Sequence, residues 1–170
     1  MKGSTIIFDA DAIYYLSQHP HLFSILKDYK VILTPNWKEL ALLRKYIDIP
    51  VEEILNKNPL PPNQSIIEID VPHKYDFSMV IKGKLDLIIG KRSFIVGTQG
   101  GLKRCGGVGD ILAGVTAPAV FWNFEYGMPL ASMIVRMANN QAWKKEGRGV
   151  TAPCVIRELS SVVNSITGEQ

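Results

Sequence analysis

The residue pattern best suited to chemistry lies in the second half of the chain, where Gly106, Gly107 and Gly109 precede Asp110. Glycines let successive backbone N–H groups turn toward one anion, because no Cβ stands in the way. The apolar stretch that follows predicts a helix from Asp110 to about Phe124, whose positive dipole end would face the same anion. The pattern therefore predicts a phosphate-binding loop with a carboxylate beside it.

A carboxylate beside a bound phosphate is repelled by it, so its presence suggests that it handles a proton. Asp110 is suited to take the proton from an attacking hydroxyl group, as a general base. The spacing alone favours equally a glycine-rich turn in which Asp110 is a plain helix cap. The loop is neither a Walker P-loop, since no G-x-x-x-x-G-K-[ST] is present, nor a dinucleotide fingerprint, which should follow the first strand.

A second candidate is the segment from Thr34 to Glu39. Asn36 and Glu39 are three residues apart at the start of a predicted helix and so lie on one face. An amide and a carboxylate there could position a hydrated Mg²⁺ near phosphates. In the alternative, which the spacing favours, Thr34 caps the helix and Glu39 only serves its dipole.

Other charged residues could join such a site. Lys103 and Arg104 precede the glycine loop and could neutralise phosphate oxygens, although such side chains are usually solvated. Asp9 and Asp11 follow the first predicted strand, at the edge where open α/β sheets bind ligands, and either could instead cap the next helix. The turn from Lys82 to Asp86 can equally be a plain hairpin.

Alternating strands and helices must position these residues, which predicts an α/β fold with a mainly parallel sheet in one domain over residues 1–170. For residues 65–77 the sequence leaves a broken helix or an extra strand open. We expect strands at residues 4–8, 30–33, 78–81, 86–89 and 93–96, and helices at residues 11–28 (broken near Pro20), 36–47, 51–56, 110–124, 129–145 and 151–166.

The overall composition narrows the function classes. The formal net charge of +3 comes from scattered basic residues, which argues against a nucleic-acid partner. Cys105 and Cys154 indicate free thiols rather than a disulfide framework, and the histidines and cysteines lack zinc spacing. No signal peptide and no apolar run of membrane-spanning length is present, so we expect a cytoplasmic protein without membrane contact.

Several segments, taken in order, resemble one known family: the ATP-dependent NAD(P)H-hydrate dehydratases of the ribokinase-like superfamily, in particular their eukaryotic branch. The matching segments are Asp9-Ala10-Asp11, Leu33-Thr34-Pro35-Asn36 with Glu39, Lys82-Gly83 with Asp86, Arg104-Cys105-Gly106-Gly107-Val108-Gly109-Asp110, and Arg136 with Asn139. The resemblance implies a three-layer α/β/α ribokinase-like fold. It covers the C-terminal part of the family's domain, so we expect an N-terminally shortened version or a fragment.

The resemblance also implies a reaction. The substrate would be hydrated NADH or NADPH, which carries a hydroxyl group on its reduced ring. ATP, or ADP, would donate a phosphoryl group to that hydroxyl, with Asp110 as base and Mg²⁺ present. Phosphate would then leave and restore the double bond.

Site residues follow from the same resemblance. The nucleotide would contact Lys82, Gly83, Lys84, Leu85, Asp86, Gly100, Gly101, Leu102, Lys103, Arg104, Cys105, Gly106, Gly107, Val108 and Gly109. The hydrate would contact Asp11, Asn36, Trp37, Lys38, Glu39, Leu40, Ala41, Leu42 and Asp110. Asn36 and Glu39 would lie near the metal without binding it directly.

Two alternative functions stay open in the sequence. One is a ribokinase-like kinase that phosphorylates a vitamin-type alcohol, although the R-C-G-G-x-G-D loop favours the dehydratase. The other is a truncated, non-catalytic nucleotide-binding subunit, which the short N-terminus favours. The sequence does not decide whether the chain forms a homo-oligomer.

Overall fold

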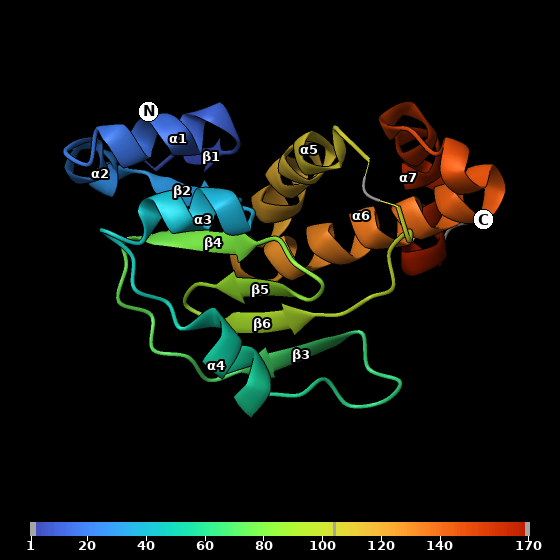
Figure 1. Ribbon diagram of the computed structural model, residues 1–170, viewed down its shortest axis with the longest axis horizontal. Coiled ribbons are helices and arrows are strands. Elements are labelled where there is room, and N and C mark those ends of the chain that lie inside the picture. Colours follow the sequence, from blue (N-terminus) through green and yellow to red (C-terminus); the bar gives the residue numbers. More distant parts are fainter. Residues whose placement is uncertain (1–2, 104, 169–170) are drawn as a thin grey trace. The chain divides into compact units, whose positions relative to one another are not determined.

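The computed structural model describes residues 3–103 and 105–168. It divides into two compact units, one up to Val96 and one from Gly97 onward. The first unit contains the whole sheet, and the second contains three helices longer than any in the first (Figure 1). The single domain that we expect over residues 1–170 stays a prediction.

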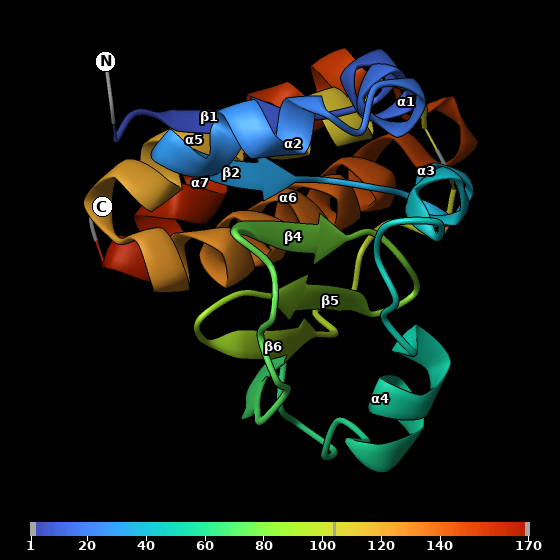
Figure 2. The ribbon, with the colours of Figure 1, turned by 90° about the vertical axis from the view of Figure 1, so that its left-hand side faces the viewer.

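The sheet has six strands in the order β1-β2-β4-β5-β6-β3. Neighbours β1, β2 and β4 are parallel, whereas β5, β6 and β3 each run antiparallel to the strand before them in that order. Strands β1, β2, β4 and β6 therefore share one direction, and Figure 2 shows β5 pointing against β4 and β6. The expected α/β class with a mostly parallel sheet is confirmed. The strands are β1 (Thr5–Phe8), β2 (Lys30–Leu33), β3 (Ile66–Ile69), β4 (Phe77–Ile81), β5 (Asp86–Ile89) and β6 (Ser93–Val96).

Helices α1 (Asp11–Gln18), α2 (Leu22–Ile25), α3 (Trp37–Leu43) and α4 (Val51–Lys57) belong to the same unit, with a short 3-10 helix at Leu26–Asp28. The expected break near Pro20 is confirmed, because α1 ends two residues before it. The stretch that the sequence left undecided contains a strand, β3. It forms an edge of the sheet and pairs antiparallel with β6.

The core of this unit lies on one sheet face, because strand side chains alternate between faces. Helices α1, α3 and α4 each contribute two buried apolar residues to it. The core residues on the helices are Ile13, Leu16, Leu40, Leu43, Val51 and Ile54, and those on the strands are Val31, Leu33, Ile69, Met79, Ile81, Leu87, Ile89 and Ile95. Their burial fixes the sheet register and hence the position of the strand ends.

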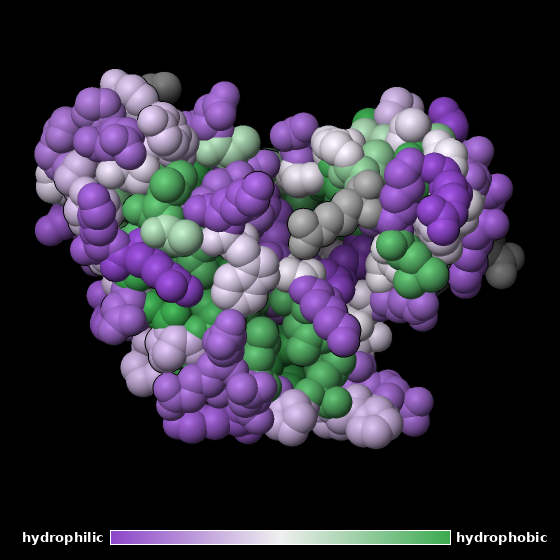
Figure 3. Space-filling model, viewed as in Figure 1, coloured by the Kyte–Doolittle hydropathy of each residue, from purple (hydrophilic) through white to green (hydrophobic). Residues whose placement is uncertain are grey.

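Helix α4 shows the division between core and solvent. Val51 and Ile54 are buried, whereas Glu52, Glu53 and Lys57 are exposed. In Figure 3 hydrophilic side chains cover the area of α4, and apolar side chains appear beside it, over β5 and β6. The helix is thus held by its apolar face, as expected for an amphipathic surface helix.

The second unit contains α5 (Val108–Trp122), α6 (Phe124–Glu146) and α7 (Ala152–Thr167), with a 3-10 helix at Gly147–Gly149. Two predicted boundaries are wrong. Helix α5 begins two residues before Asp110, because Gly107 rather than Asp110 is its N-cap. Helix α6 begins at Phe124 rather than Pro129, because the Asn123 side chain accepts hydrogen bonds from two backbone amides there.

Tertiary packing accounts for the second error. Gly127 lies in the first turns of α6, and an added Cβ would come within 2.4 Å of the Ala119 carbonyl oxygen of α5. This close approach holds the start of α6 against α5, so that Pro129 is accommodated inside a helix. Among the residues that the structure describes, no helix combines the length and apolar character needed to cross a bilayer.

A pH-dependent stability is expected from His73, which lies between β3 and β4. Its Nδ1 is buried without a hydrogen-bond partner among the described residues. Burial lowers the pKa of His73 below its usual 6.5, against the attraction of Asp76 and together with the repulsion of Lys91. The unfolded chain binds the proton more readily, so the free energy of unfolding should decrease as pH falls through 6.5.

Urea unfolding at several pH values between about 7.5 and about 5.5 would measure this slope. His73→Gln should flatten it, whereas the matched substitution of the exposed His21, His21→Gln, should not. Equal slopes for His73→Gln and the unsubstituted chain would contradict the assignment.

Candidate functional site

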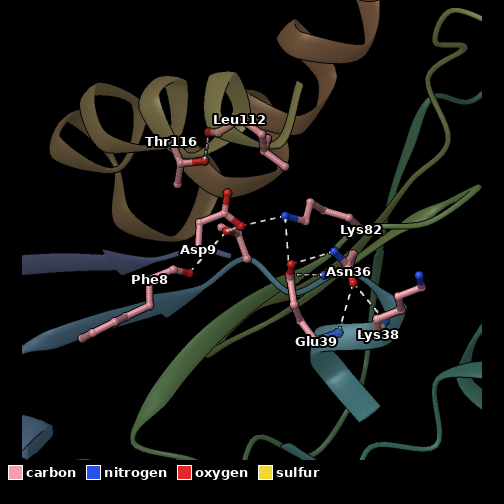
Figure 4. Close-up of polar contacts among 9 residues, drawn as sticks. Phe8, Asp9, Asn36, Lys38, Glu39, Lys82, Leu112 and Thr116 are labelled. Carbon is pink, nitrogen blue, oxygen red and sulfur yellow. Dashed lines mark hydrogen bonds and ion pairs between the residues drawn. The ribbon is translucent and has the colours of Figure 1, made fainter. Parts of the chain in front are cut away.

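The first unit gathers a polar cluster at the carboxyl ends of β1, β2 and β4 (Figure 4). Asp9, directly after β1, accepts hydrogen bonds from the Thr34 hydroxyl and from Lys82 Nζ, each over 2.7 Å. Lys82 Nζ also lies 3.8 Å from Glu39 Oε2. The side chains of Lys82, Asp9 and Glu39 are only 20%, 14% and 17% exposed, so this charged group is largely withdrawn from solvent.

Helix α3 positions Glu39 through a capping box. Asn36 Oδ1 accepts hydrogen bonds from the backbone amides of Lys38 and Glu39, at 2.9 and 3.0 Å. Glu39 in turn accepts from the Asn36 backbone amide and side-chain amide, at 2.9 and 2.7 Å. The expected cap at Thr34 is wrong: Asn36 caps the helix, and the buried Thr34 hydroxyl binds Asp9 instead.

The turn from Lys82 to Asp86 joins this cluster. The Lys82 amide donates to the Pro35 carbonyl over 2.8 Å, and the Gly83 amide donates to Asp86 Oδ1 over 2.9 Å. An added Cβ at Gly83 would come within 2.7 Å of the Leu85 carbonyl oxygen and 3.3 Å of Trp37 Nε1. The turn therefore requires glycine, and it fixes Lys82 beside the start of α3.

Asp9 belongs to this cluster and Asp11 does not, so the contact of Asp11 with the substrate that the family resemblance implies stays a prediction. Asp11 is exposed in the first turn of α1. Between them Ala10 has a φ of 47°, which non-glycine residues rarely adopt and which concentrates at functional sites. The turn at Ala10 ends β1 with the Asp9 carboxylate facing Thr34 and Lys82.

Of the residues expected at the substrate, Leu40 is buried in the core, and Trp37, Lys38, Ala41 and Leu42 are exposed.

Loss of the capping box should measurably destabilise this unit. Asn36→Ala is expected to lower the free energy of unfolding by about 1 to 2 kcal/mol, because two helix amides lose their acceptor. Urea unfolding would measure the change. Asn56→Ala is the matched control, because Asn56 is exposed within α4 and alanine is the better helix former there. Equal losses in both variants would contradict the importance of the cap.

The same contacts bear on Mg²⁺. Both oxygens of the Glu39 carboxylate and the Asn36 side-chain oxygen accept hydrogen bonds within the capping box. No group of three or more acidic, histidine or cysteine side chains suited to a metal ion occurs in the described ranges. The residues therefore do not fit a direct magnesium site, and an indirect role for Asn36 and Glu39 stays a prediction.

The second unit contains the glycine loop. Gly107 has a φ of 86° and is the N-cap of α5. The first hydrogen bond of the helix runs from the Ile111 amide to the Gly107 carbonyl. The amides of Val108, Gly109 and Asp110 come before it, so they have no acceptor within the helix. An added Cβ at Gly107 would lie 2.9 Å from Ala152 Cβ and 3.9 Å from Asp110 Oδ2. The exposed Asp110 carboxylate therefore lies at the amide-rich start of its own helix.

The segment before this loop is attached to α6 and to the 3-10 helix after it. Arg136 Nε donates to the Thr98 carbonyl over 2.7 Å, and Lys103 Nζ donates to the Arg148 carbonyl over 2.6 Å. Gly101 packs so closely that an added Cβ would lie 2.9 Å from Asn139 Oδ1. Gly101 is therefore required by packing against α6.

Two buried polar atoms in this region have no hydrogen-bond partner in the described part of the chain. Thr98 Oγ1 and Asn139 Oδ1 are buried, and neither has a hydrogen-bond partner among residues 3–103 and 105–168. Such atoms are costly unless something satisfies them. Sequence reasoning missed Thr98, since a single threonine after a strand carries no distinguishing signal.

The expected nucleotide-binding residues thus fall into two groups. Lys82, Gly83, Lys84, Leu85 and Asp86 form the turn in the first unit. Gly100, Gly101, Leu102, Lys103, Cys105, Gly106, Gly107, Val108 and Gly109 belong to the second unit, and Arg104 lies outside the described residues.

Comparison with known proteins gives a consistent family. A family model described as NAD(P)H-hydrate dehydratase matches residues 1–161. The chain is 28% identical over 181 residues to the ATP-dependent (S)-NAD(P)H-hydrate dehydratase of Danio rerio, covering 98% of this chain and 52% of that protein. It is 32% identical over 170 residues to the protein of the same name from Ciona intestinalis, covering 92% of this chain and 45% of the relative. The chain therefore spans about half the length of these curated relatives.

A crystal structure supports the fold. A hypothetical protein from Streptococcus mutans has 22% sequence identity to this chain and a TM-score of 0.65. The match covers 98% of this chain and 56% of that one. At this identity the similarity shows the fold.

Proposed function

Because the chain belongs to the NAD(P)H-hydrate dehydratase family, we propose that it acts in the ATP-dependent dehydration of hydrated NADH and NADPH, the reaction named for its relatives. The observation that carries the catalytic part is the geometry of the glycine loop. Left-handed Gly107 opens α5, and an exposed carboxylate lies in the first turn. This geometry supports an anion site with a base next to it.

On this proposal Asp110 takes the proton from the ring hydroxyl of the hydrated nicotinamide. The hydroxyl oxygen then bonds to the γ-phosphorus of ATP as the bond from that phosphorus to ADP breaks. The backbone amides of Val108 and Gly109 and the dipole of α5 stabilise the negative charge on the transferring group. Phosphate leaves from the resulting ester, and loss of a neighbouring ring proton restores the double bond.

Several of the residues predicted to bind ATP have polar groups that are able to bind a ligand. The ammonium of Lys82 has three donors, of which Asp9 uses one, so it can also bind a phosphate oxygen. Asn139 Oδ1 has no hydrogen-bond partner among the described residues, which supports a contact with the amino group of the base that would satisfy this buried acceptor. Residues 100–109 would follow the phosphates. The cytoplasmic location stays a prediction. The sequence leaves ATP and ADP open as donor, and the names of the relatives favour ATP.

The test is recovery of reduced nicotinamide. The purified chain is incubated with hydrated NADH and ATP, and the near-ultraviolet absorbance of NADH is followed, with an otherwise identical mixture lacking ATP as control. ATP-dependent recovery would support the proposal. A stable phosphate ester without recovery would indicate a kinase, and the absence of both products would overturn the proposal for this chain.

ATP binding is measured separately, because binding can persist when turnover fails. A ligand at about 100 times its dissociation constant stabilises a protein by about 2.7 kcal/mol, so ATP should raise the melting temperature. A chain that binds ATP without restoring NADH would be a non-catalytic nucleotide-binding protein.

A further inference from the structure

Helix α5 has an apolar face that is exposed. Gly114, Ala117, Pro118, Phe121 and Trp122 are all exposed, and their spacing of three and four residues places them in one stripe along the helix. Phe121 is 86% exposed, the highest value among the large apolar side chains of the described residues, and Trp122 is 76% exposed. These five residues are called the α5 face below.

The composition of α5 does not suit a surface helix. After Asp110 the helix contains no charged residue as far as Trp122. Its other side carries the buried residues Ile111, Leu112, Thr116, Ala119 and Val120, so the helix is apolar all round. That pattern is typical of a helix buried on every side. Helix α7 differs, because its exposed positions include Arg157, Ser160 and Ser161.

The length of the relatives indicates what would cover this face. About half of each curated relative has no counterpart in this chain, although the matched half includes all of α5. In addition, an added Cβ at Gly114 would meet nothing within 4 Å, so the middle of the face is open to close approach by another backbone. Phe121 and Trp122 at its end are large enough to anchor a partner.

We propose that the α5 face is the docking surface for polypeptide that corresponds to the remainder of the family's domain. An apolar segment packs along Gly114 and Ala117 and covers Phe121 and Trp122. The inference depends on family membership and not on the proposed reaction. Docking without turnover would therefore leave it intact.

In the first unit, the two edges of the sheet differ in how well they are protected against further pairing. Edge strand β3 carries Glu68, which is paired with Arg92 over 2.7 Å, and such charges protect an edge against further pairing. Edge strand β1 contains only Thr5, Ile6, Ile7 and Phe8, without a charge or proline. No strand of the described residues pairs with its outer side. Strand β1 is therefore an open edge at which a strand could be added, as a separate contact in the first unit.

The test uses the chain together with the part of a relative that has no match in it. The portion of the Danio rerio protein outside its match to this chain is affinity-tagged and co-expressed with the chain. We expect the two to co-purify in a one-to-one complex. The double variant Phe121→Asp/Trp122→Asp should lose at least about tenfold in affinity, because two charges would be buried in an apolar contact.

Ile156→Asp is the matched control, since Ile156 is an apolar residue of α7 that is 54% exposed. It should bind like the unsubstituted chain. Circular dichroism would verify that each variant folds, and hydrogen exchange at the Ile7 amide should slow in the complex if a strand is added at β1. Unchanged exchange there would restrict the contact to α5.

Three outcomes would overturn the proposal. Equal capture of the chain and the double variant would place the contact elsewhere. If the tagged portion of the relative fails to capture a chain that is folded and monomeric, the remainder of the family's domain would be excluded as the occupant of the α5 face. Light scattering that shows a dimer, which Phe121→Asp/Trp122→Asp converts to a monomer, would make a second copy of the chain the occupant.

Discussion

Asp110→Asn is expected to reduce the rate of NADH recovery by about 10²- to 10⁴-fold, the usual contribution of a positioned general base. Asparagine has nearly the same size and keeps the N-terminal turn of α5, but it cannot accept the hydroxyl proton. ATP binding should persist, and it should strengthen if removal of the negative charge relieves repulsion by phosphate. Absorbance recovery measures the first effect, and the ATP-dependent shift in melting temperature measures the second.

Glu125→Gln is the matched control for this prediction. Glu125 lies in the first turn of α6, as Asp110 lies in the first turn of α5, so both substitutions remove one acid from a helix start. Only the Asp110 variant should lose turnover. Equal turnover in Asp110→Asn and the unsubstituted chain would end the assignment of Asp110 as base, whatever the status of ATP binding.

Gly127→Ala is expected to cost the second unit about 3 kcal/mol or more of stability. A Cβ there would lie 2.4 to 2.6 Å from three backbone atoms of Ala119 and Val120. Backbone cannot rotate away as a side chain can, so α5 and α6 would have to separate, and overpacking of this kind typically costs 1 to 3 kcal/mol even where side chains can adjust. Thermal and urea unfolding would both measure the loss.

Gly114→Ala provides the contrast within the adjacent helix. An added Cβ at Gly114 meets nothing within 4 Å, so alanine should stabilise the helix by about 0.4 to 1 kcal/mol. Opposite signs for the two substitutions are therefore expected. A Gly127→Ala variant as stable as the unsubstituted chain would show that α5 and α6 do not pack closely at this point.

Much of the fold could be predicted because local patterns determine it. The strands from β4 to β6 are short apolar runs separated by glycine-containing turns, and their predicted positions agree with the structure to within one residue. The glycine and aspartate residues of the loop before α5 could be selected as a candidate phosphate site from spacing alone. Their reaction could not be identified in this way, since a capped glycine turn has the same sequence pattern.

The errors come from contacts between distant residues. Thr34 resembles a helix cap, but Asp9, 25 positions away, is its partner in the structure. The contact of Asp9 with Lys82, 73 positions away, is likewise invisible in local sequence, and the place of Asp11 at the substrate stays a prediction. Pro129 resembles a helix start because the packing of Gly127 on α5 cannot be read from local sequence.

The attachment of the segment before the glycine loop has a consequence for binding thermodynamics. Near one end of this segment, the Thr98 carbonyl accepts a hydrogen bond from Arg136. Near the other end, Lys103 donates to the Arg148 carbonyl, and between the two Gly101 packs against Asn139. Its conformational entropy is therefore lost when the chain folds rather than when a ligand arrives. A preorganised segment leaves more of the interaction energy available as affinity. Arg136→Leu should therefore weaken ATP binding mainly through a less favourable binding entropy, which calorimetry would measure. This effect is expected even though Arg136 Nε binds the Thr98 carbonyl of the chain and not the ligand.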